Sequence, residues 1–217
     1  LICFHLFNRK EYMLIQLSDA GKKFNREWIF QSLSYRFDTG KKYALTGPNG
    51  SGKSTLLQVL AGSMNLSQGN ITWSLHDQAV DTDHIFKHLS IAAPYLELIE
   101  EMTATEFLVF HSSFKPFLNN ISIPDILQII GLEKAAQKQI RYYSSGMKQR
   151  IKLAQAIFSD CPLLLLDEPC TNLDEHGYSL YHHLIDQYAN GKTIIVSSND
   201  INEYKFCTDK IYVPDHK

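Results

Sequence analysis

Short apolar segments and longer amphipathic segments follow one another along this sequence. Apolar or alternating runs predict strands, because successive side chains of a strand point to opposite faces of the sheet. The strands predicted in this way are Met13–Leu17, Ile29–Phe37, Tyr43–Thr46, Asn70–Trp73, His88–Ala93, Leu163–Leu166, Thr193–Ser197 and Lys210–Val213.

Segments with apolar residues at helical spacing lie between these strands. One of them opens with Thr103 and Glu106 in the spacing of a capping box, which satisfies the free amides of a helix N-terminus. Another carries apolar residues at steps of four, three and four, which places them on one helix face: Met147, Ile151, Ala154 and Phe158. The predicted helices run from Lys53 to about Gly62, Thr103 to about Phe114, Pro124 to Ile130, Ser144 to Ser159, His176 to Ala189 and Ile201 to Phe206.

The order of these elements predicts the fold class. Strands that alternate with helices are typical of an α/β fold with a mostly parallel sheet. The interval from about Leu98 to Gln149 contains helices alone, which predicts an inserted helical subdomain. We therefore expect one domain over residues 13–213, an upstream extension without a functional role at residues 1–12 and a tail at residues 214–217.

Composition excludes several classes of function. Lys and Arg number 21 and Asp and Glu number 23, so the net charge of −2 argues against a nucleic-acid partner, which would require a surplus of basic residues. No apolar run approaches the roughly 20 residues of a membrane-spanning helix, so a membrane role would require a partner. None of the four cysteines forms a C-x-x-C pair, which favours reduced thiols and a cytoplasmic setting.

A glycine-rich loop between a predicted strand and a predicted helix carries the strongest chemical signal. Its residues match the phosphate-binding pattern G-x-x-x-x-G-K-[ST], followed by one further threonine: Gly47, Pro48, Asn49, Gly50, Ser51, Gly52, Lys53, Ser54 and Thr55. Glycines allow backbone N–H groups to surround a phosphate, and the helix N-terminus adds partial positive charge. Lys53 is expected to reach the β- and γ-phosphates of ATP, and the Ser54 hydroxyl to bind Mg²⁺.

Two carboxylates end the apolar strand Leu163–Leu166. Ligands bind at the carboxyl ends of parallel strands, which is where Asp167 and Glu168 are expected. We expect Asp167 to hold Mg²⁺, directly or through water, and Glu168 to act as the general base that deprotonates the attacking water. The alternative is a solvated strand end without a catalytic role.

Two further segments resemble the ABC-type ATPase family. The stretch from Tyr143 to Arg150 resembles the family's signature motif, and Thr171–Asp174 resembles its D-loop. With the phosphate loop, these motifs stand in the family's order, and the resemblance extends over about residues 13–213. It implies an ABC-type P-loop NTPase fold with antiparallel N-terminal strands, and it implies roles for the signature residues Ser144, Ser145, Gly146 and Met147 and for Asp174.

The resemblance also implies how ATP is shared. The signature residues offer hydroxyl and backbone donors at a helix N-terminus, and the family uses them to contact the γ-phosphate bound by a second subunit. An aromatic residue should stack on adenine, and Phe24 matches that position, with Trp28 as the alternative. Both could instead pack on the sheet.

Two positions depart from the family pattern. The family usually has Gln after the strand that leads into the helical subdomain, whereas residues 92–97 contain none, and it has His where Asn199 stands. Asn199 can donate a hydrogen bond to the γ-phosphate but cannot carry a proton. The signature is also altered, with Ser145 in place of Gly and Met147 in place of Gln. We therefore expect an ATPase that is slow or is stimulated by its partner.

Three functions remain open from the sequence. The chain could be the ATP-hydrolysing subunit of a transporter, bound to a separate permease on the cytoplasmic face of the membrane. It could be an ABC-type ATPase that acts on a soluble assembly. It could also be a module that binds ATP with little hydrolysis.

Overall fold

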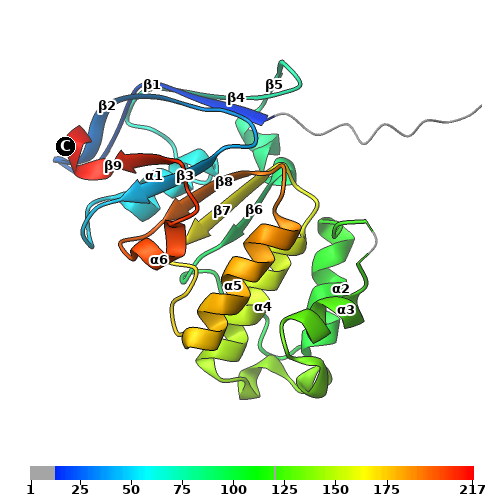
Figure 1. The fold of residues 1–217 in the computed structure, drawn as a ribbon. Helices are drawn as coiled ribbons and strands as arrows, with labels where there is room; N and C mark the ends of the chain where they lie inside the picture. Colours follow the sequence, from blue (N-terminus) through cyan, green and yellow to red (C-terminus); the bar gives the residue numbers. More distant parts are fainter. Residues whose placement is uncertain (1–12, 120) are drawn as a thin grey trace, which may run out of the picture.

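The computed structural model describes residues 13–119 and 121–217, so the expected extension at residues 1–12 lies outside the described residues. An antiparallel sheet forms one layer, in the strand order β2-β1-β4-β5 (Figure 1). Its strands are β1 (Met13–Phe24), β2 (Glu27–Phe37), β4 (Gln68–Leu75) and β5 (Gln78–Val80).

A second sheet is parallel throughout, in the order β6-β7-β8-β3-β9. Its strands are β3 (Lys42–Thr46), β6 (Leu89–Ala92), β7 (Leu163–Asp167), β8 (Thr193–Ser197) and β9 (Asp209–Tyr212). Strands far apart in sequence are therefore neighbours, and the carboxyl ends of β3, β7 and β8 meet at one edge. The α/β fold with a parallel sheet is confirmed.

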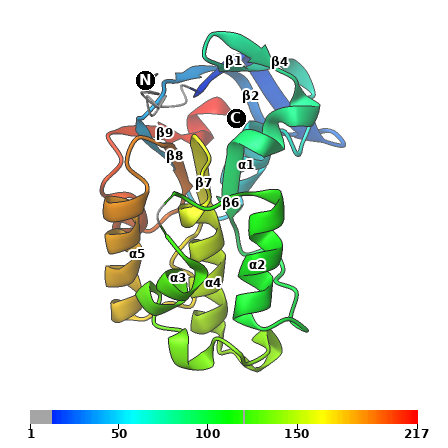
Figure 2. The same ribbon diagram turned by 90° about the vertical axis from the view of Figure 1, so that its right-hand side faces the viewer.

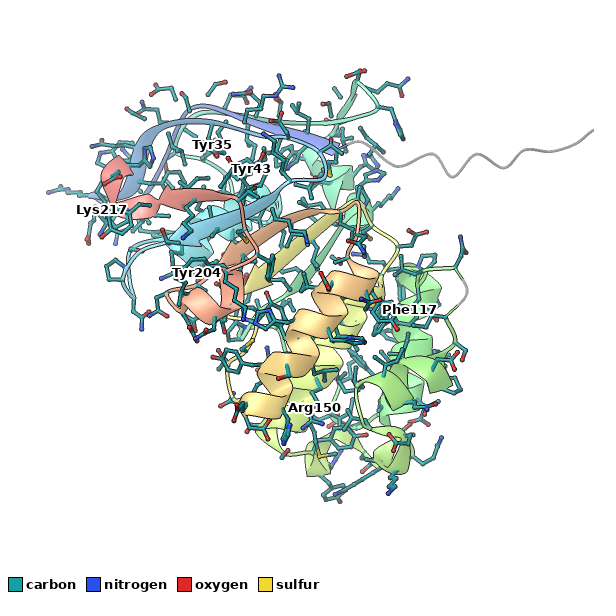
Figure 3. All side chains as sticks on the ribbon, viewed as in Figure 1. Tyr35, Tyr43, Phe117, Arg150, Tyr204 and Lys217 are labelled. Carbon is teal, nitrogen blue, oxygen red and sulfur yellow. The ribbon has the colours of Figure 1, made fainter. Side chains whose placement is uncertain are left out.

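The two faces of β7 pack against different layers, because its side chains alternate. Leu163 and Leu165 face the antiparallel sheet and helix α1 (Lys53–Leu60). Leu164 and Leu166 face the helical side of the molecule. Figure 3 shows Tyr35 and Tyr43 between the two sheets, where their ring centroids are 6.0 Å apart. Burial on both faces explains why this strand is a continuous apolar run.

The remaining α-helices lie on the other side of the parallel sheet (Figure 2). Thr103 and Ser122 each form a complete capping box; Thr103 begins α2 where predicted, and α3 begins at Ile123, one residue before the predicted Pro124. The α-helices are α2 (Ala104–Phe114), α3 (Ile123–Ile129), α4 (Ser145–Phe158), α5 (Glu175–Tyr188) and α6 (Ile201–Tyr204). Four short 3₁₀ helices complete the described residues: η1 (Thr82–His88), η2 (Glu133–Ala135), η3 (Ile140–Tyr142) and η4 (Val213–His216).

Some elements differ from the sequence prediction. The first strand continues to Phe24, although polar residues interrupt its alternation after Leu17, because register shifts between Leu17 and Lys23 absorb the irregularity. The expected tail at residues 214–217 lies largely in η4, and Pro214 lies beside Gly47 of the phosphate loop. Strand β5 and the 3₁₀ helices η2 and η3, with three residues each, are too short to produce a recognisable hydrophobic period.

Candidate functional site

The phosphate loop joins the end of β3 to the start of α1. Gly52 has a φ of +101°, and a Cβ there would lie 2.4 Å from Ile29 Cγ2. Gly47 has a φ of +140°, and a Cβ there would lie 2.8 Å from Pro214 Cδ. Both positions require glycine, because any other side chain would be strained at this φ and its Cβ would clash with a neighbouring side chain. The chain can therefore turn tightly here and keep the backbone open to a ligand.

Lys53 is held inside this loop. Its side chain is buried, and Nζ donates hydrogen bonds to the carbonyl oxygens of Gly47, at 2.8 Å, and Pro48, at 3.1 Å. The ammonium group thus lies where the loop turns around the N-terminus of α1. A cation and a helix N-terminus directed at one place form a site for a polyanion.

A cavity of about 230 Å³ opens over this loop. Its lining comes from the loop, from β2 and from the residue after β7: Ile29, Asn49, Gly50, Ser51, Gly52, Lys53, Ser54, Thr55 and Glu168. The tertiary structure therefore brings the predicted general base to the predicted phosphate site, across more than half of the sequence. Ile29 was not among the residues that the sequence analysis selected, since nothing in its local pattern distinguishes it from a core residue.

Asp167 lies at the end of β7 with its carboxylate almost wholly buried. It is 2% exposed, and its Oδ1 has no hydrogen-bond partner. Ser197, its register partner on β8, also has a buried hydroxyl without a partner. A buried carboxylate oxygen without a donor is costly unless a cation binds it. The hard oxygen ligands that Mg²⁺ prefers are present here, so Asp167 together with Ser54 fits the cation of a magnesium nucleotide.

Glu168 occupies a strained backbone position at the strand end. Its φ is +43°, which is unfavourable for a residue with a Cβ. Its amide donates to the carbonyl oxygen of Ser197 at 2.8 Å, which fixes the start of the following loop. Such strain is typical of functional positions, where the surrounding structure holds the residue in place.

Asn199 follows β8 and approaches the phosphate loop. Its Nδ2 donates to Asn49 Oδ1 at 3.0 Å. The residue that departs from the family pattern is therefore beside the predicted phosphate site. In this arrangement its amide is engaged by the loop rather than free for a ligand.

Tyr95 is a further residue at this edge that the sequence analysis did not select. Burial raises the pKa of its phenol, and the charge of Asp167 raises this pKa further. Tyr95 follows β6, whose partner strand β7 ends in Asp167, so the register places the two segments beside each other. No local sequence signal identifies Tyr95, because the pairing of β6 with β7 is a tertiary contact.

The signature residues lie away from this cavity. Ser144 is the N-cap of α4, and its hydroxyl accepts a hydrogen bond from the amide of Met147 at 3.3 Å. Ser145 lines a different cavity, of about 420 Å³. Gly146 approaches the loop after β7, since a Cβ there would lie 3.2 Å from the carbonyl oxygen of Asn172. The donors at the start of α4 are therefore separate from the phosphate cavity of the same chain.

The other two predicted residues have simpler environments. Asp174 is the N-cap of α5, where its Oδ1 accepts a hydrogen bond from the amide of Gly177 at 2.8 Å. Phe24 is 47% exposed at the end of β1, and Lys22 Nζ lies 5.2 Å from its ring centroid. Phe24 does not line the phosphate cavity, whereas Ile29 of the next strand does.

Comparison with known proteins gives a consistent result. The sequence profile of the ABC transporter family matches residues 30–171. The chain is 33% identical to the ABC transporter ATP-binding protein YybJ of Bacillus subtilis, over 86% of this chain and 85% of that protein. It is 32% identical to the Nod factor export ATP-binding protein I of Rhizobium sp. (strain N33), over 93% of this chain and 68% of that protein.

A solved structure has the same fold. The dimeric structure of a bacterial ABC transporter cassette superimposes with a TM-score of 0.75 at 22% identity, covering 92% of this chain and 95% of that chain. At this identity the likeness concerns the fold alone. Within residues 13–119 and 121–217, no helix has both the length and the apolar character that crossing a membrane requires.

Proposed function

Because the chain belongs to the ABC transporter family, we propose that it is the ATP-binding and ATP-hydrolysing subunit of a membrane transporter. The observation that carries this proposal is the shared cavity of the phosphate loop and Glu168. A binding loop alone would suit any nucleotide-binding protein. A carboxylate in the same cavity adds a base that can act on water beside the γ-phosphate.

Each residue of the site has a distinct part in the reaction. The loop amides and Lys53 would bind the phosphates, and Ser54 and Asp167 would hold Mg²⁺, which would offset charge on the phosphate oxygens. Glu168 accepts a proton from water as the water oxygen bonds to the γ-phosphorus and the bond to ADP breaks. Asn199 is placed to donate a hydrogen bond to the γ-phosphate once its contact with Asn49 is released.

The separation of the two donor sets supports the proposal that ATP drives dimerisation. Ser144, Ser145, Gly146 and Met147 lie outside the phosphate cavity of their own chain, so a γ-phosphate bound there would need a second subunit to reach them. The dimeric state of the cassette with the same fold supports this arrangement. The second subunit is either another copy of this chain or a close relative.

The membrane-spanning part of the transporter would be a separate permease chain. Relatives of this chain are described as ATP-binding proteins of Nod factor export and of lantibiotic transport. We propose that this chain binds its permease at the cytoplasmic face of the membrane. Recovery of a polytopic protein with the tagged chain from native membranes would support this partner, and recovery of only soluble proteins would favour an ATPase acting on a soluble assembly.

Hydrolysis should be slow without the permease. The segment after β6 provides no Gln, and Asn199 replaces a residue that could carry a proton. Loss of one donor to the transition state costs about 10²–10³ in rate in other enzymes.

Phosphate release from the purified chain with Mg²⁺ and ATP tests the proposal. Wild type should exceed Glu168→Gln at least a hundredfold, and Glu175→Gln, an exposed carboxylate at the start of α5, should match wild type. With ATP and Mg²⁺, Glu168→Gln should also elute as a dimer. Equal rates for wild type and Glu168→Gln would refute hydrolysis at this base, and a dimer formed under those conditions would then favour a module that binds ATP without turning it over.

A further inference from the structure

A single buried peptide unit in the loop after Glu168 is held from two sides. Gln149 Nε2 donates to the carbonyl oxygen of Pro169 at 2.7 Å. The amide of Cys170, on the other end of the same peptide bond, donates to Glu203 Oε1 at 2.7 Å. Gln149 and Glu203 are each 4% exposed, so water does not compete for either bond.

The two side chains come from elements that carry other predicted site residues. Gln149 lies on α4, the helix that begins with Ser145 and Gly146. Glu203 lies on α6, which follows Asn199 after a single residue. The Pro169–Cys170 peptide therefore connects the helix of the signature motif to the segment of Asn199 through the loop of the general base.

This loop needs external support because its backbone is strained. Glu168 has a φ of +43° and Asn172 a φ of +65°, both in the left-handed region. Asn adopts this region readily, whereas for Glu168 it costs about 1–3 kcal/mol, which contacts from the surrounding structure must offset. Within the loop itself, the amide of Thr171 donates to the carbonyl oxygen of Glu168 at 3.1 Å, and the amide of Leu173 donates to that of Cys170 at 2.9 Å. The contacts from Gln149 and Glu203 add restraints from outside the loop.

The chemistry at Glu203 indicates more than packing. Its Oε2 is buried without a hydrogen-bond partner, so the carboxyl group is kept in the interior at a cost. Burial raises the pKa of Glu203, hydrogen bonds from Ser198 and from the amide of Cys170 lower it, and the charges of Asp200 and Glu168 raise it. The hydroxyl of Tyr181 donates to the carbonyl oxygen of Glu203 at 2.8 Å and fixes this turn of α6.

We propose that Gln149 and Glu203 are positioning residues for the reaction, and that they hold the Pro169–Cys170 peptide so that Glu168 points into the phosphate cavity. This inference rests on the proposed function, because it concerns the rate of a reaction at Glu168. It also predicts that a movement of α4 reaches Glu168 through one hydrogen bond, since Gln149 is part of that helix.

Four single variants and one double variant separate this role from general stability. Glu203→Met and Gln149→Met remove the acceptor and the donor at similar volume, and their combination removes both. Glu203→Gln keeps an oxygen that can accept from the amide of Cys170. Lys192→Met is the matched control, because Lys192 is also buried and donates to main-chain carbonyls, those of Ile157 and Ser159, away from the loop.

Steady-state kinetics of ATP hydrolysis form the first measurement. Each Met variant should lower kcat at least tenfold with KM within about twofold of wild type, because a misplaced base slows the chemical step without loosening the phosphate loop. The double variant should lose little more than either single variant, since both residues hold one peptide. Glu203→Gln should retain most of kcat, and Lys192→Met should retain all of it.

Hydrogen exchange of the Cys170 amide in nucleotide-free protein forms the second measurement. Protection should fall at least tenfold in Glu203→Met and remain in Glu203→Gln. Unchanged protection and unchanged kcat in folded Met variants would overturn the proposal, and so would a loss of kcat in Lys192→Met equal to theirs. If wild type hydrolysed no ATP but its Cys170 protection depended on Glu203, the proposed ATPase function would fail while the positioning contact stood.

Discussion

Replacing Asp167 by Asn should stabilise the magnesium-free protein and abolish its response to magnesium ATP. Asp167 is 2% exposed, and its Oδ1 lacks a hydrogen-bond partner. Leaving a buried polar atom unpaired costs about 1–3 kcal/mol, and more for a charged group. Asn removes the charge at nearly the same volume, so we expect a gain of about 2 kcal/mol in unfolding free energy. For a chain of this length that is a rise of about 4–8 °C in Tm.

Thermal unfolding of the two proteins, with and without magnesium ATP, measures both effects. At a hundred times its dissociation constant, a ligand that binds only the folded state adds about 2.7 kcal/mol. Wild type should show this increase and Asp167→Asn should not. Asp186→Asn, which changes an exposed carboxylate on α5, should shift stability by no more than about 0.5 kcal/mol and keep the ligand response.

Two results would contradict this reasoning. If Asp167→Asn melts below wild type in a metal chelator, the carboxylate is not held at a net cost in the free protein. If the variant retains the full increase with magnesium ATP, Asp167 does not hold the metal. The two outcomes concern separate claims, because the first involves no ligand and the second compares each protein with itself.

Three other predictions follow from the structure. Lys53→Ala should abolish ATP binding, measured by calorimetric titration, because it removes the cation inside the phosphate loop; unchanged affinity would contradict this role. Thr103→Ala should lower the free energy of unfolding, measured in urea, by about 1 kcal/mol, because it breaks the capping box of α2. Thr103→Ser keeps the hydroxyl and is the control, so equal stability of the two variants would contradict this prediction. Burial, aided by the charge of Lys115, lowers the pKa of His111 to about 4 from 6.5, so the unfolded chain binds more protons between these pH values. Stability should therefore fall by about 1–2 kcal/mol as pH decreases through this window, solvent screening included, and His111→Gln should flatten the profile measured by denaturant unfolding.

Local patterns were sufficient for most of the secondary structure. The segment Thr193–Ser197 is a strand with the predicted bounds, and the capping residue Thr103 begins a helix where predicted. These elements depend on nearest neighbours in sequence, through side-chain alternation and through the free amides of a helix start. The family profile confirmed the resemblance drawn from the motifs and their order.

Local patterns did not predict which segments distant in sequence would contact each other. The positions of Ile29 and Tyr95 at the site depend on which strands become neighbours, as does the approach of Asn199 to Asn49. The two hydrogen bonds to the Pro169–Cys170 peptide have the same origin, since Gln149 and Glu203 have no unusual local pattern. In the sequence each is an ordinary polar residue of a predicted helix, and only the tertiary structure shows that it is buried.

The sequence alone predicted the kind of chemistry, because the spacing from Gly47 to Ser54 and the acidic end of Leu163–Leu166 require only local backbone geometry. The tertiary structure alone decided which groups lie together, because parallel strands joined by long crossovers bring their carboxyl ends to one edge regardless of separation along the chain. It also decided that Asp167 would be buried without a partner and that Glu168 would be held in a strained conformation. Both features depend on packing from other elements, which no local pattern contains.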